Sequence, residues 1–168
     1  YNIIYIVAYF STLVGFFLGD RGWLRITVNR LYRPAVGELL LAGVNLPPAI
    51  VFYLLYPVGL IIFAVGPAIK GGNISTGIFL GAMFGLFTYA TYDLTNQATL
   101  RGWPTILTLA DITWGTVLAG SSAAWACWIV SKLALRASSG RPVFKNLVPL
   151  TARPVAELEQ TQRARRRL

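Results

Sequence analysis

The chain of 168 residues is 55% hydrophobic and only 12% charged, and its mean hydropathy is +0.59. A soluble domain usually carries about 25% charged residues, so these values indicate an integral membrane protein. The sequence has no histidine and only one cysteine, Cys127, which excludes two-histidine metal sites, cysteine-based zinc sites and intrachain disulfides. The net charge of +9 is unevenly distributed, because nine of the fifteen Lys and Arg residues follow Ser131.

Four stretches are long and apolar enough to cross a membrane, which takes about 20 residues as a helix. They are Asn2–Gly19, Pro47–Ile69, Ile74–Leu94 and Pro104–Ser131. Four spans place the segments 20–46 and 95–103 on one side of the membrane and both termini of the chain on the other. The sequence therefore predicts an all-α, integral membrane four-helix bundle at 1–132, followed by an extended, basic, proline-containing tail at 133–168.

The first span is expected to end at Asp20, and the segment 20–46 that follows it carries a regular polar pattern. Four polar residues recur every four positions and would form one stripe on a helix: Arg21, Arg25, Asn29 and Arg33. This pattern predicts an amphipathic connector helix, either as an extension of the first span or lying on the membrane surface. A solvated, charged connector is the alternative.

Two prolines are expected to interrupt helices. Pro34 should break the connector helix, because its ring and its missing N–H are incompatible with a helix interior. Pro57 lies near the middle of the second span, after Tyr53 and Tyr56. It should therefore kink that span.

The third and fourth spans each carry small residues at every fourth position. In lipid, helices associate through close backbone contact, which small residues allow. We therefore expect these two spans to form an antiparallel pair through their small-residue faces, which consist of Gly77, Gly81, Gly85, Gly115, Ala119 and Ala123.

Three aspartates approach the same side of the predicted membrane. A carboxylate inside a span usually faces protein, forms a pair, or lines water. We expect a polar cluster at this end of the bundle, with nearby arginines available to neutralise it: Asp20, Asp93, Asn96, Arg101 and Asp111. At least one aspartate should have an arginine, tyrosine or amide partner. The cluster could bind a cation or a polar head group, relay protons, or simply fix the register of the helices, and these alternatives stay open.

Two long stretches carry a resemblance to a known family: "LFTYATYDLTNQATLRGWP" and "LTLADITWGTVLAG". With "LYRPAVGELL" and "VFYLLYPVGLIIFAVGPAI" before them, they resemble an uncharacterised family of small, mostly bacterial, predicted membrane proteins, the domain of unknown function DUF2177. The resemblance covers roughly Ile3 to Lys132. It implies four spans with an acidic residue at the end of the first, matched here by Asp20 and Trp23, although "DRGW" stands where a more apolar stretch would be expected. It implies no established activity.

The tail after Lys132 lies outside this resemblance and is too polar to span a membrane. After Pro154, early glutamates and late arginines suit the dipole of a short helix, whereas disorder is the alternative for an isolated chain. Basic tails bind anionic lipids or acidic protein surfaces, and no interleaved aromatic pattern favours nucleic acid. The residues expected to make such contacts are Arg153, Arg163, Arg165, Arg166 and Arg167.

These features favour a non-catalytic accessory or structural subunit of a larger respiratory or photosynthetic membrane complex, with its tail over neighbouring subunits. The alternative is a small transporter, or a lipid-binding or ion-binding membrane protein, that uses the Asp/Asn cluster. We expect no enzymatic activity, no metal site and no cofactor of its own, with room for lipid or pigment at the periphery. The expected partners are membrane lipids and other membrane subunits, without nucleic acid. The expected location is a bacterial inner membrane, a mitochondrial inner membrane or a thylakoid membrane.

Overall fold

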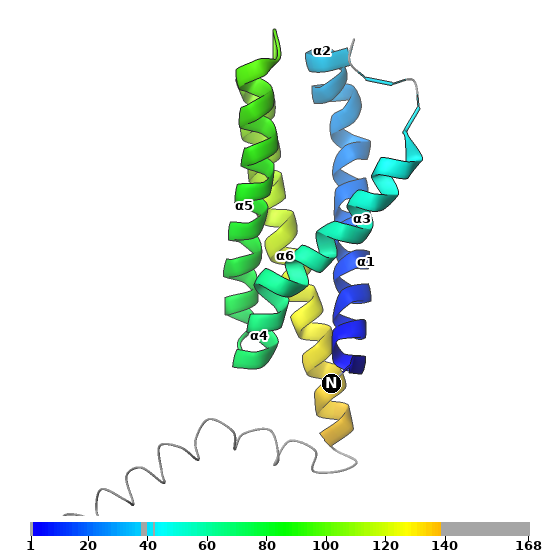
Figure 1. Ribbon diagram of the computed structural model, residues 1–168, viewed down its shortest axis with the longest axis vertical. Helices are drawn as coiled ribbons and strands as arrows, with labels where there is room; N and C mark the ends of the chain where they lie inside the picture. The colour runs from blue at the N-terminus through cyan, green and yellow to red at the C-terminus, as the bar shows by residue number, and fades with distance from the viewer. Residues whose placement is uncertain (1, 38–39, 42, 139–168) are drawn as a thin grey trace, which may run out of the picture. The chain divides into compact units, whose positions relative to one another are not determined.

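The computed structural model describes residues 2–37, 40–41 and 43–138 (Figure 1). All regular elements in these ranges are helical, and four helices there are long and apolar enough to cross a membrane: Ile3–Val36, Leu46–Gly71, Ile74–Thr99 and Thr105–Leu135. The predicted all-α membrane fold is confirmed. By its contacts the chain divides after Val130. The predicted tail contacts, from Arg153 to Arg167, lie outside the described residues.

The first helix is much longer than the predicted first span, in agreement with the predicted arrangement in which the connector extends that span. It continues from α1 (Asn2–Thr27) through the π-helical segment η1 (Val28–Tyr32) into α2 (Arg33–Val36). The predictions that this span ends at Asp20 and that Pro34 breaks the helix are both wrong. Pro34 lies in the first turn of α2, directly after the wide turn of η1, so its ring avoids the crowding that a regular helix interior imposes. The connector is therefore mainly an extension of the first helix.

The second helix also contains a π-helical turn. It consists of α3 (Leu46–Leu60), η3 (Ile61–Val65) and α4 (Gly66–Gly71). Pro57 is buried inside α3, and η3 begins four residues later, where Gly66 N–H donates to the Ile61 carbonyl. The helix is thus distorted near Pro57, as expected, but not broken, and π-helical turns commonly accompany such distortions. In Figure 1 it crosses the other helices obliquely.

Short connections join the remaining helices. Gly72 has a φ of +64° and ends α4, after which the Asn73 side chain accepts a 2.9 Å hydrogen bond from Ser75 N–H and starts α5 (Ile74–Thr99). Gly102, with a φ of +80°, makes the turn before α6 (Thr105–Ser138). Consecutive spans are antiparallel, so α2 and the end of α5 lie at the same end of the bundle (Figure 1). We refer to this end as the α2 end.

The helices α5 and α6 touch through their backbones. Gly77, Gly81 and Gly85 are all buried. A Cβ atom on Gly81 would lie 2.8 Å from both the Ala119 carbonyl oxygen and the Ala123 Cβ, and one on Gly85 would lie 2.7 Å from the Ala119 Cβ. The structure thus brings together the two small-residue faces and leaves no room between them for a methyl group.

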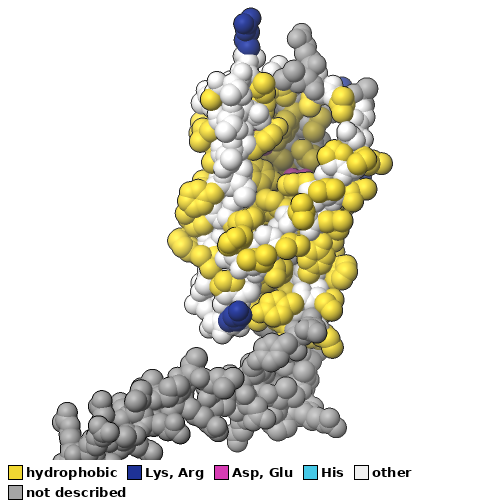
Figure 2. Space-filling view, in the orientation of Figure 1, with side chains coloured by type: hydrophobic (Ala, Val, Ile, Leu, Met, Phe, Trp, Pro, Cys, Tyr) yellow, Lys and Arg dark blue, Asp and Glu magenta, His cyan; other side chains and the backbone are white. Residues whose placement is uncertain are grey.

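The core lies where the four spans meet, and the outside of the bundle is apolar. Phe16 of α1 stacks on Tyr56 of α3 with their ring centroids 4.4 Å apart. Small and aliphatic side chains of η3, α4 and α6 complete the buried cluster. Large apolar side chains cover much of the visible face of the helices (Figure 2), as expected for a bundle whose surroundings are acyl chains rather than water.

Replacing Gly81 by alanine should destabilise the bundle. Alanine gains about 0.5–1 kcal/mol over glycine within a helix, but forcing a methyl group into a packed contact costs about 1–3 kcal/mol, so we expect a net loss. Gly22→Ala is the matched control, because a Cβ atom there meets nothing within 4 Å. Unfolding of the purified variants in detergent measures both changes, and an unchanged stability of Gly81→Ala would contradict the close α5–α6 contact.

Candidate functional site

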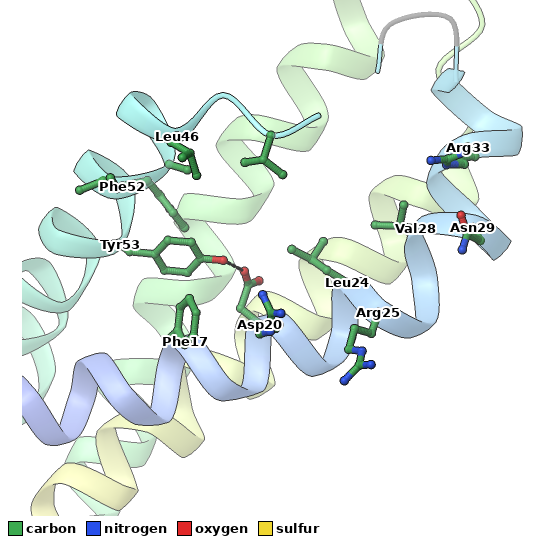
Figure 3. Close-up of a pocket in the computed structure, with 14 residues that line it drawn as sticks. Phe17, Asp20, Leu24, Arg25, Val28, Asn29, Arg33, Leu46, Phe52 and Tyr53 are labelled. Carbon is green, nitrogen blue, oxygen red and sulfur yellow. Dashed lines mark hydrogen bonds between the residues drawn. The ribbon is translucent and has the colours of Figure 1, made fainter. Parts of the chain in front are cut away.

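Asp20 lies inside the first helix and bonds to the second. The Tyr53 hydroxyl of α3 donates a 2.5 Å hydrogen bond to Asp20 Oδ2, and the Asp20 side chain is only 8% exposed. Figure 3 shows this bond in the space between α1 and α3. A hydrogen bond to a charged acceptor contributes about 1.5–3 kcal/mol, so this pair ties the first helix to α3 near the middle of the first helix.

Asp111 of α6 bonds to the long extension of the first helix. The Tyr32 hydroxyl donates to Asp111 Oδ1, and Trp23 Nε1 donates to the Tyr32 oxygen over 3.4 Å. The Trp23 ring stacks on Trp114 of α6, with ring centroids 4.8 Å apart and planes inclined by 6°. These contacts cover Asp111, which is 4% exposed, and they hold the first helix against α6.

The π-helical turn places Tyr32 on the correct side of its helix. Nine residues separate Tyr32 from Trp23, and nine residues make about two and a half turns of a regular α-helix. An uninterrupted helix would therefore point Tyr32 away from Trp23 and α6. A π-helical turn such as η1 (Val28–Tyr32) contains more residues than an α-helical turn. Each residue therefore turns the helix through a smaller angle, which brings Tyr32 back toward Asp111.

Asp93 is the most enclosed of the three aspartates. Its side chain is fully buried, and neither carboxyl oxygen has a hydrogen-bond partner within the described residues. It lies on α5 within electrostatic range of Asp111. A buried carboxyl group without donors is costly, so packing alone does not account for its place in the bundle.

The arginines do not neutralise these carboxyl groups, contrary to expectation. None of the three aspartates forms an ion pair with an arginine in the described part of the chain; the donors to Asp20 and Asp111 are tyrosines. Arg101 is exposed in the turn before α6. Asn96 is half-buried on α5, one turn beyond Asp93 and close to Tyr92. The expectation of an arginine, tyrosine or amide partner is therefore met only by tyrosines.

Two cavities open beside these aspartates. The first, which we call the arginine groove, has a volume of about 940 Å³ and lies between the first helix and α3. It is lined by Phe17, Asp20, Arg21, Leu24, Arg25, Val28, Asn29, Arg33, Val44, Leu46, Ala49, Ile50, Phe52 and Tyr53. All four residues of the polar stripe in the sequence thus border one cavity.

The second cavity, which we call the tyrosine chamber, has a volume of about 400 Å³. Its lining comes from four helical segments and consists of Tyr32, Phe52, Tyr56, Thr88, Tyr89, Tyr92 and Asp111. Only Phe52 borders both cavities. The predicted polar cluster is therefore divided, because Asp20 borders the groove and Asp111 borders the chamber. Figure 2 shows a hollow toward the α2 end of the bundle, with an acidic side chain visible in it.

The individual tyrosines of the site are the residues that sequence reasoning missed. The sequence predicts an arginine, tyrosine or amide partner for an aspartate but does not identify Tyr32, Tyr53 or Tyr56 as a site residue. Their signal was present, because a buried tyrosine usually finds a hydrogen-bond partner and a carboxylate in a span needs a donor. No group of three or more Asp, Glu, Cys or His side chains in the described residues is arranged to hold a metal ion.

Asp111 can be tested by two substitutions of similar size. Asp111→Asn should be tolerated, because its amide oxygen still accepts the hydrogen bond from Tyr32. Asp111→Leu leaves the Tyr32 hydroxyl without its acceptor and should destabilise the protein by about 1–3 kcal/mol. Thermal or denaturant unfolding in detergent compares the two variants. Equal stability of Asp111→Leu and the native protein would show that this hydrogen bond does not hold the first helix against α6.

Comparison with known proteins agrees with this architecture. The family described as "Predicted membrane protein (DUF2177)" matches residues 5–128, which include every residue of the groove and the chamber. No curated protein and no solved structure matches the chain. The match extends over most of the sequence and ends before the basic tail. The chain therefore belongs to the DUF2177 family of predicted membrane proteins.

Proposed function

We propose that this protein binds a phospholipid in the arginine groove. The observation that carries the proposal is that one groove is lined by apolar side chains together with arginines of the first helix. Phe17 and Leu24 are apolar, Arg21 and Arg25 alternate with them, and Arg33 lies farther along the helix toward its α2 end (Figure 3). Phe17 and Arg33 are sixteen positions apart, which is roughly 24 Å along a helix at 1.5 Å per residue.

The apolar part suits an acyl chain. Phe17 and Leu24 of the first helix and Phe52 of α3 point into the space between the two helices (Figure 3). The volume of about 940 Å³ lies within the range of ligand pockets, about 300–1,000 Å³.

The cationic part suits a phosphate group. Arg21, Arg25 and Arg33 are exposed and do not pair with the aspartates of the bundle. A guanidinium group presents a planar fork of donors that matches phosphate oxygens, often with two parallel hydrogen bonds. The nearby carboxyl group of Asp20 accepts its hydrogen bond from Tyr53, so the guanidinium groups remain available to a ligand.

The accessory-subunit hypothesis depends in part on the tail after Lys132, whereas the groove is built from described residues. Lipid binding, the alternative function expected from the sequence, is therefore the function that the geometry supports best. The phospholipid would come from the surrounding membrane. Its binding needs neither a catalytic group nor a metal ion.

The proposal can be tested with two lipids that differ only in their phosphate. The full chain in a neutral detergent should bind phosphatidic acid at least about tenfold more tightly than diacylglycerol with the same acyl chains, because one charge-assisted hydrogen bond is worth about 1.5–3 kcal/mol and 1.4 kcal/mol is a factor of ten. The triple variant Arg21→Gln, Arg25→Gln, Arg33→Gln should lose this preference. Native mass spectrometry measures the retained lipid.

The matched control is the double variant Arg30→Gln, Arg101→Gln. Both of these arginines are exposed, and neither borders the groove. The control should keep the preference for phosphatidic acid, apart from a small general effect of the lower positive charge. Equal losses in the two variants would contradict a phosphate site in the groove and would indicate a diffuse attraction of anionic lipid to any basic surface.

A further inference from the structure

The lining of the tyrosine chamber differs from that of the groove, because it is mainly aromatic and contains no arginine. Its walls are aromatic rings, and one carboxyl group, that of Asp111, faces it. Tyr56 and Tyr89 meet almost at right angles, with an angle of 89° between their planes and 6.4 Å between ring centroids, and Phe52 is inclined by 49° to Tyr56. These three rings therefore form differently oriented walls around one space.

The hydroxyl groups of two tyrosines in the chamber lining already have hydrogen-bond partners. The Tyr32 hydroxyl donates to Asp111, and the Tyr56 oxygen lies 3.1 Å from the Thr88 hydroxyl. The chamber therefore offers a ligand mainly the faces of its rings and a carboxyl group. The face of an aromatic ring carries negative charge density and attracts cations, so this lining favours a positively charged ligand.

The unneutralised carboxyl groups near the chamber also favour a positively charged ligand. Asp93, which is fully buried and has no hydrogen-bond partner within the described residues, lies within electrostatic range of Asp111. Neither carboxyl group has an arginine or lysine partner among those residues. A cation in the chamber would supply the positive charge that this pair of acids lacks.

The shape of the chamber selects among cations. A bare metal ion requires several oxygen ligands at short range, whereas the lining consists largely of carbon rings. Aromatic walls around a carboxylate are the arrangement that recognises quaternary ammonium groups. The volume of about 400 Å³ exceeds the space that a single metal ion would fill, and it lies at the lower end of the range for small-molecule pockets, about 300–1,000 Å³.

We propose that the tyrosine chamber binds a quaternary ammonium group between the rings of Phe52, Tyr56, Tyr89 and Tyr92, with Asp111 as its counter-ion. The group could belong to a lipid head or to a small soluble cation, and the chemistry of recognition is the same in both cases. The inference does not depend on a phospholipid in the arginine groove, because the two cavities share only Phe52.

The probe is tetramethylammonium chloride, added to the full chain in a neutral detergent, with sodium chloride at the same concentration as the reference. A ligand that binds only the folded state raises the unfolding temperature. We expect a saturable rise with tetramethylammonium and none with sodium. An equal response to both salts would overturn the proposal, because it would reflect ionic strength or an alkali-metal site.

Variants of Tyr92 and Asp111 test the chamber itself. Tyr92 is 59% exposed, so its replacement should leave the fold intact. Tyr92→Leu should weaken tetramethylammonium binding by roughly tenfold, whereas Tyr92→Phe, which keeps the ring face, should not. Phe87→Leu removes a comparably exposed ring, 62%, from the same helix outside the chamber, and it should have no effect. Equal losses in Tyr92→Phe and Tyr92→Leu would overturn the aromatic cage.

Asp111→Asn keeps the hydrogen bond to Tyr32 but removes the counter-ion, so it should weaken the binding by at least about tenfold. Asp20→Asn is its control, because Asp20 borders the groove and not the chamber. The triple arginine variant should still bind tetramethylammonium, which separates a failure of this inference from a failure of phospholipid binding. Unchanged binding by Asp111→Asn would overturn the role of the carboxyl group.

Lipid nanodiscs distinguish the two sources of the ligand. If lipid head groups fill the chamber, the response to tetramethylammonium should vanish in nanodiscs of phosphatidylcholine and persist in nanodiscs of phosphatidic acid. A response of equal size in both would assign the chamber to a small soluble cation. No response in either, with a response in detergent, would overturn the proposal for the protein in a bilayer.

Discussion

Burying the Asp111 carboxyl group among apolar helices requires a hydrogen-bond donor, and much of the structure at the α2 end follows from this requirement. Asp111 receives its donor from Tyr32, which belongs to the extension of the first helix. Without that extension the first span would end near Asp20, and no side chain of the first helix would reach Asp111 at this level. The π-helical turn η1 then sets the direction of Tyr32. One hydrogen bond therefore depends on the length of a helix, on its irregularity and on the stacking of Trp23 upon Trp114.

The close contact of α5 and α6 has a second consequence for the site. Because Gly81 and Gly85 leave no room for a methyl group against α6, the two helices bring Asp93 and Asp111 within electrostatic range of each other. Two acids held in this way repel each other when both are ionised. A structural role alone would be served better by one aspartate and one amide. The pairing of two acids beside a cavity with aromatic walls is more easily understood as a preparation for a cationic ligand.

The sequence predicted the number of spans, the α5–α6 pairing and the end of the bundle that carries the aspartates. These features depend on the length of apolar stretches and on the spacing of small residues, which are local properties of the chain. It did not predict the helix through Pro34, or that tyrosines rather than arginines would be the partners and which tyrosines these would be. A π-helical turn leaves no periodic signal of its own, and the propensity of proline to end helices was the only local evidence available. Whether a buried carboxyl group pairs with arginine or tyrosine depends on which side chain can stay inside the bundle. Arginine keeps its charged end in water, whereas a tyrosine ring is compatible with an apolar interior.

This difference between arginine and tyrosine separates the two cavities chemically. The arginines of the first helix are exposed and give the groove positive charge. Tyr32, Tyr56 and Tyr89 are buried or half-buried and give the chamber aromatic walls with an acidic group. The groove therefore suits an anionic ligand and the chamber suits a cationic one. Phe52 borders both cavities. A zwitterionic phospholipid carries the two complementary charges within one head group. A single lipid of this kind would engage both sites only if its head group reached from the groove to the chamber past Phe52, whose side chain lines both cavities.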